Sequence, residues 1–123
     1  MRRFDHEKLG VYTAALDWLT TADAIAKALP RGRGYLADQL RRAATSVVLN
    51  IAEGAGEFAR DEKARFYRMA RRSATECAAV VDVGSRLELI APELAARGRG
   101  QLLDIVSMLV RLARSVGESR RDG

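Results

Sequence analysis

Cysteine and histidine, the residues from which disulfides and most zinc sites are built, are almost absent from this sequence. The chain has one cysteine and one histidine in 123 residues, so it forms no internal disulfide and no Cys/His zinc cluster. A chain without disulfides is typical of the reducing cytosol, and we expect a cytoplasmic protein. No run approaches the roughly 20 apolar residues that span a bilayer, and no apolar signal segment follows the N-terminal arginines. We therefore expect no membrane partner.

The usual motifs of catalysis and cofactor binding are missing as well. The sequence contains no phosphate-binding glycine loop, no dinucleotide-binding fingerprint and no HExxH zinc motif. It also lacks the Glu-x-x-His pairs of di-iron bundles. The lone histidine, His6, is near the N-terminus, and Cys77 lies on an apolar helical face, where a cysteine usually acts as a small hydrophobe. We expect a nonenzymatic protein without metal or cofactor; the alternative is a hydrolase that uses Glu53 and Glu76 as paired carboxylates.

Prolines are few, and long stretches of the chain are free to be helical. Only Pro30 and Pro92 occur, and apolar residues recur at helical spacing in four segments separated by Gly/Pro-containing breaks. The pattern predicts one domain, 1–123, with helices over about 5–29, 35–55, 61–90 and 100–117 and a frayed polar tail over 118–123. Short connections make neighbouring helices antiparallel, so we expect an all-α, antiparallel up-down-up-down four-helix bundle.

Two details of this pattern carry further expectations. Gly54 and Gly56 suggest that the second helix ends in a left-handed turn. The apolar arcs of the first and fourth helices are wider than one bundle core requires, because Val11, Trp18 and Ile25 broaden the first of them. Surplus apolar surface favours a subunit interface, so we expect a homo-oligomer.

A polar stripe runs along the second helix at its shoulder. Its residues are spaced by three or four positions, and two residues of the third helix complete the set: Gln39, Arg42, Ser46, Asn50, Glu53, Ser73 and Glu76. One interpretation is a structural network in which Arg42 meets Glu53 or Glu76 and Asn50 satisfies backbone groups near Gly54. That interpretation predicts that Glu53→Ala lowers stability. The other interpretation is ligand recognition.

Positive charge is concentrated at the start of the third helix. The chain has a net charge of +5 and a pI of about 10. Residues 60–72 alone carry a net charge of +4. Four arginines share a predicted outward face and a fifth continues it: Arg65, Arg68, Arg71, Arg72 and Arg86. This face is either a solvated surface or a stripe that contacts phosphates. No aromatic side chain is interleaved for base stacking, which favours contacts with the backbone over sequence readout.

Residues 39–54, QLRRAATSVVLNIAEG, closely resemble the pattern Q-L-R-R-A-x-x-S-[IV]-x-x-N-I-A-E-G. This pattern belongs to the four-helix bundle family first described from intervening sequences of 23S rRNA genes. Two more segments are similar to that family: residues 9–15 fit its L-x-V-[WY]-x-x-A opening, and residues 66–76 fit F-x-x-x-A-x-[GR]-S-x-x-E. Arg72 replaces the commoner glycine, and Glu57 stands where a basic residue often follows.

The resemblance implies an antiparallel four-helix bundle that often assembles as a homopentamer. Some relatives are accessory subunits of diversity-generating retroelements, in which a basic pentamer binds nucleic acid and the reverse transcriptase. We therefore expect a nonenzymatic oligomeric accessory protein that binds RNA or DNA with little sequence specificity, with a reverse transcriptase or another protein as a further partner. The alternative is an assembly or scaffold subunit that binds protein alone.

Overall fold

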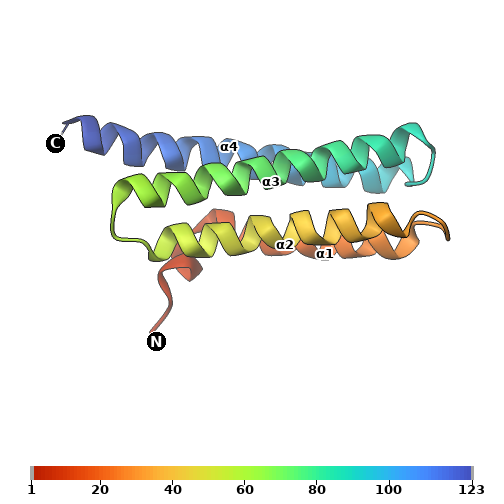
Figure 1. Cartoon of the computed structure of the whole chain (residues 1–123), viewed down its shortest axis with the longest axis horizontal. Coiled ribbons are helices and arrows are strands. Elements are labelled where there is room, and N and C mark those ends of the chain that lie inside the picture. The colour runs from red at the N-terminus through yellow and green to blue at the C-terminus, as the bar shows by residue number, and fades with distance from the viewer. Residues whose placement is uncertain (1, 123) are drawn as a thin grey trace.

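A computed structural model describes residues 2–122, and it describes side chains for residues 2–117. A short 3-10 turn, η1 (Asp5–Lys8), precedes four helices: α1 (Gly10–Ala28), α2 (Gly34–Gly56), α3 (Arg60–Arg86) and α4 (Pro92–Asp122). Successive helices run in opposite directions, with α1 and α2 beside each other below α3 and α4 (Figure 1). Over residues 2–122 the chain has no strand. The predicted all-α four-helix bundle is confirmed. No helix of the described chain is long and apolar enough to cross a membrane.

The first and third helices are shorter than their patterns predict. Residues 5–8 form the 3-10 turn, and Leu9 is extended, so α1 begins only at Gly10. At the other end of the bundle α3 stops at Arg86, where Glu88 adopts the left-handed conformation with φ 58°. The amides of Glu88 and Leu89 donate to the carbonyls of Ser85 and Gly84 at 3.0 and 2.8 Å, which is a Schellman ending. The sequence hides this ending because glutamate, not glycine, takes the left-handed position.

The fourth helix begins at Pro92 rather than near residue 100, and this prediction was wrong. Proline suits the first helical turn because its missing N–H has no partner there. Gly98 lies inside α4, and a Cβ at this position would be 3.0 Å from the Trp18 ring. It permits close packing against α1 and does not break the helix. The backbone of α4 runs to Asp122, and the side chains of the predicted frayed tail, 118–123, lie outside the described residues.

Gly54 serves packing too, and the predicted left-handed ending of α2 is wrong. Both Gly54 and Gly56 are helical, and among the described glycines only Gly32 has a positive φ. A Cβ on Gly54 would be 2.7 Å from the ring of Tyr67, so only a glycine lets α3 approach this closely. The Lys63 ammonium donates to the carbonyls of Gly54 and Ala55 at 2.9 and 3.0 Å. These bonds cap α2 and attach it to the start of α3.

The core explains the wide apolar arc of α1. Val11, Trp18 and Ile25, which motivated the predicted subunit interface, are buried inside the chain's own core. A helix in a four-helix bundle contacts two neighbours, here α2 and α4, so its buried arc is broad without any partner chain. The helix α2 also carries a buried apolar stripe, which comprises Leu36, Leu40, Ala43, Val47 and Ile51.

Candidate nucleic-acid interface

Part of the polar stripe is hydrogen-bonded and joins α2 to α3, and the rest of it is exposed. The hydroxyls of Ser46 and Ser73 are 2.9 Å apart and join α2 to α3. The Asn50 amide donates to the Ser46 carbonyl at 2.9 Å and to its hydroxyl at 3.0 Å. These three half-buried residues satisfy one another, as buried polar groups do in native proteins.

The other members of the stripe are exposed. Over the part of the chain whose side chains are described, four of them make no hydrogen bond or ion pair: Gln39, Arg42, Glu53 and Glu76. Arg42 therefore meets neither Glu53 nor Glu76, and Lys63, not Asn50, binds the carbonyls near Gly54. Arg42 and Glu53 border an open groove beside α2, where water solvates long charged side chains. Glu76 is not part of that groove, so the two carboxylates of the alternative hydrolase do not share it.

We now expect Glu53→Ala to change the free energy of unfolding by less than about 0.5 kcal/mol, because Glu53 is exposed and unpaired. Loss of one partner from a buried charged network costs roughly 3 kcal/mol or more. Asn50→Ala removes two hydrogen bonds and is expected to cost about 1 kcal/mol. Urea denaturation followed by circular dichroism compares the variants. A larger loss of stability for Glu53→Ala than for Asn50→Ala would support the seven-residue structural network.

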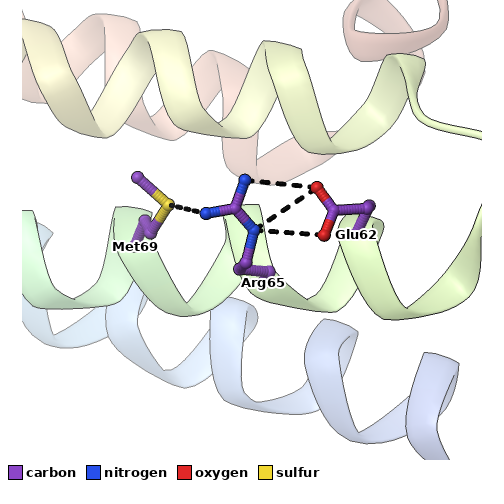
Figure 2. A network of polar contacts seen from close by, with 3 residues as sticks. All are labelled: Glu62, Arg65 and Met69. Carbon is purple, nitrogen blue, oxygen red and sulfur yellow. Dashed lines mark hydrogen bonds and ion pairs between the residues drawn. The ribbon is translucent and has the colours of Figure 1, made fainter.

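Arg65 does not offer a free charge. Figure 2 shows its guanidinium lying along α3 between Glu62 and Met69. The Nε atom donates to both carboxylate oxygens of Glu62 at 3.2 and 3.3 Å, and Nη2 donates to one of them at 3.2 Å. The same guanidinium lies 5.0 Å from the centre of the Phe66 ring. Glu62 therefore neutralises Arg65, and Arg65 covers the aromatic ring next to it.

Arg68 and Arg71 face α4 and line a groove between the two helices. This α3–α4 groove has a volume of about 410 Å³, and α4 contributes a third arginine, Arg114. Its remaining lining is mostly apolar: Tyr67, Leu109, Val110, Ala113 and Gly117. Arg68 also borders an adjoining hollow toward the start of α3, which Arg60 and Asp61 line. Tyr67 is only 2 % exposed, so it lies at the bottom of the groove and offers no face on which a base could stack.

Arg72 and Arg86 complete the predicted set, but they lie apart from the groove. Both side chains are exposed, and neither makes an ion pair within residues 2–117. Arg86 is the last residue of α3, at the end opposite Arg60. The five predicted arginines are therefore not one continuous stripe. The sequence did not reveal Arg114, because the face that α4 turns toward α3 depends on packing.

Cys77 and His6, the two side chains that the sequence offers as nucleophile and base, are both packed against other side chains. Burial, together with a smaller contribution from the charge of Glu76, raises the pKa of the Cys77 thiol to about 12, although Trp18 acts in the opposite direction. Cys77 is therefore a protonated thiol at neutral pH and a poor nucleophile. His6 packs between Phe4 and Tyr12 in the N-terminal turn. In the described chain no group of three His, Cys, Asp or Glu residues is placed to hold a metal ion.

The sequence profile of the 23S rRNA-intervening sequence protein family matches residues 7–111, which is most of the chain. The chain belongs to this family. The resemblance predicted from residues 39–54 is thereby confirmed. No curated protein matches the chain.

A solved structure has the same fold as this chain. It is a protein of unknown function from the S23 ribosomal protein family of Bacteroides thetaiotaomicron. The TM-score is 0.78 at 20 % sequence identity, over 85 % of this chain and 95 % of that one. At this identity the likeness shows the fold alone.

Proposed function

We propose that this member of the 23S rRNA-intervening sequence protein family is an oligomeric accessory protein that binds RNA or DNA through the α3–α4 groove, with little sequence specificity. The observation that carries the proposal is the convergence of Arg68, Arg71 and Arg114 on one groove, which no acidic side chain of residues 2–117 lines. A phosphate entering it would meet three guanidinium groups from two helices.

The free state of these arginines supports the proposal. None of the three makes an ion pair with a side chain of residues 2–117, so a phosphate would displace no partner among these residues. Guanidinium groups donate bidentate hydrogen bonds to phosphate oxygens, and each contact releases counterions from the nucleic acid. The described residues that line the groove offer no exposed aromatic ring and no amide side chain to read base edges. Binding of this kind recognises the backbone and is nearly independent of sequence.

The direct test is a fluorescence anisotropy titration of the unmutated protein on mixed-sequence RNA and duplex DNA. Four arginines along the groove and its adjoining hollow, Arg60, Arg68, Arg71 and Arg114, would contact up to four phosphates per chain. We expect affinity to fall by about 100-fold between roughly 50 and 200 mM salt. Absence of binding at the lower salt concentration would refute the function.

Assembly into a homo-oligomer, with a pentamer favoured, remains part of the proposal. Several copies of the groove on one particle would engage a long polyanion together and raise avidity. The α1 residues that first suggested an interface are buried within the chain, so the family resemblance now carries most of this proposal. Light scattering at micromolar concentration tests it, and a 13.5 kDa monomer would contradict it. A reverse transcriptase or another protein is proposed as a further partner on the same grounds.

The alternative function, a protein-assembly subunit, is favoured by the open groove beside α2. Leu49 is 58 % exposed there, next to the unpaired Arg42 and Glu53 and the half-buried Phe66. An apolar side chain framed by free charges of both signs suits a protein partner, such as a second copy of this chain. Leu49→Asp would then break the assembly and leave nucleic-acid binding per chain intact.

A further inference from the structure

The N-terminal segment carries an ordered stack of aromatic rings that the α3–α4 groove does not use. The Phe4 ring stacks on His6 with centroids 5.5 Å apart and planes inclined by 15°. His6 in turn meets the ring of Tyr12 edge-on at 4.6 Å. Tyr12 packs against the hydrophobic core, so one end of the stack is anchored in the bundle. At the other end Phe4 is 72 % exposed.

The backbone holds this exposed ring in place. The Phe4 amide donates to the Glu7 carboxylate at 3.3 Å, and the Glu7 amide donates to the Phe4 carbonyl at 3.1 Å. The Leu9 amide closes the turn on the His6 carbonyl at 3.1 Å. A ring fixed in advance loses little conformational entropy when a ligand covers it, while its burial is favourable.

The charges around the ring are those that a phosphate-bearing ligand needs. Arg2 and Arg3 directly precede Phe4, are exposed, and make no ion pair with any described residue. Both nearby carboxylates are engaged: Asp5 lies 3.6 Å from the Lys8 ammonium, and Glu7 accepts the Phe4 amide. Aromatic faces beside basic side chains are the recurring elements of sites for single-stranded nucleic acid.

We propose that the exposed face of Phe4 stacks on an unpaired nucleobase of single-stranded RNA or DNA, while Arg2 and Arg3 contact the flanking phosphates. The inference rests on the proposed nucleic-acid binding and adds a preference for single strands, since the bases of a duplex are stacked on one another. The turn lies at the same end of the bundle as the beginning of α3 (Figure 1). A strand bound near Arg60 and the N-terminal stack are therefore at the same end of the molecule.

The test compares Phe4→Leu with Phe58→Leu in the full chain. Leucine keeps an apolar side chain and removes the ring, and Phe58 is a matched control because it is fully exposed in the α2–α3 connection with no described ring contact. The probes are RNA and DNA single strands containing 2-aminopurine, an abasic strand and a duplex, all of equal length. Phe4→Leu should weaken binding of either base-containing strand about tenfold and abolish the 2-aminopurine response. Affinity for the duplex and the abasic strand should not change.

The outcomes separate the stack from the groove. Equal affinity of Phe4→Leu and Phe58→Leu for single strands would refute base stacking on Phe4 and would not affect the proposed role of the groove. Dissociation of an oligomer by Phe4→Leu, with unchanged binding per chain, would also refute base stacking, because a second copy would then cover the ring. A single-strand defect in Phe4→Leu together with no effect of charge reversal at Arg68, Arg71 and Arg114 would support the stack and refute the groove. Failure of the unmutated protein to bind any probe at low salt would refute both.

Discussion

Charge reversal in the α3–α4 groove, Arg68→Glu/Arg71→Glu/Arg114→Glu, is expected to weaken binding of RNA and duplex DNA by about 100-fold or more at low salt. Each substitution would remove a proposed contact with phosphate and place a carboxylate in a groove that no acidic side chain of residues 2–117 lines. All three side chains are solvent-exposed, so the bundle should stay folded. Anisotropy titrations give the affinity, and circular dichroism checks the fold.

A second triple variant separates geometry from total charge. Arg31→Glu/Arg97→Glu/Arg111→Glu changes three exposed arginines that do not line the groove. Because each change replaces a positive with a negative charge, both variants lower the net charge from +5 to −1. The control variant should lose far less affinity than the groove variant. Equal losses of affinity in the two variants would mean that overall charge determines binding and that no particular face binds.

The largest effect on stability is expected from Gly54→Val. The valine side chain would enter the space of the Tyr67 ring, which is 2 % exposed, and would also meet the Cβ of Phe66. Neither group is the free end of a flexible side chain, so α2 and α3 must move apart. Overpacking of this kind costs about 3 kcal/mol, and the melting temperature should fall by roughly 10 °C.

Gly56→Val is the matched control, since Gly56 lies in the same last turn of α2 and nothing lies within 4 Å of a Cβ added there. We expect this variant to remain within about 0.5 kcal/mol of the unmutated protein. Urea and thermal unfolding at one protein concentration measure both variants. Similar stability of the two would show that Gly54 is not needed for the approach of α3.

The number and order of the helices could be predicted because apolar residues recur at helical spacing in the sequence. Leu36, Leu40 and Ile51 repeat on one face, and the structure buries that face. The same signal could not decide whether α1 forms a subunit interface, because a broad apolar arc is found both on a helix with two neighbours and on a helix with a partner chain. Trp18 illustrates this, because the groups that cover it, including Gly98, lie far from it in the sequence.

The positions where the helices end were harder to predict, since they depend on contacts between helices. Gly54 and Gly98 look like stops in the sequence, yet both are helical and admit the rings of Tyr67 and Trp18. Conversely, Glu88 takes the left-handed position that ends α3, although glycine is the usual residue there.

The candidate site was predicted in outline only. A count of charges located the basic region of α3, but it did not show that Glu62 neutralises Arg65 or that Lys63 caps α2. It also missed Arg114, which α4 brings to the same groove. Ion pairing and the relative rotation of two helices decide which arginines remain free, and neither follows from the spacing of residues along one helix.

The most direct test of the central claim is the salt dependence of duplex binding for Arg68→Gln/Arg71→Gln/Arg114→Gln. Glutamine removes the charges without adding repulsion, and Arg31→Gln/Arg97→Gln/Arg111→Gln provides the control. If the groove holds the phosphates, the slope of log K against log salt should become shallower by about 2 to 3 for the groove variant and stay nearly unchanged for the control. The same slope for both variants and the unmutated protein would contradict the account.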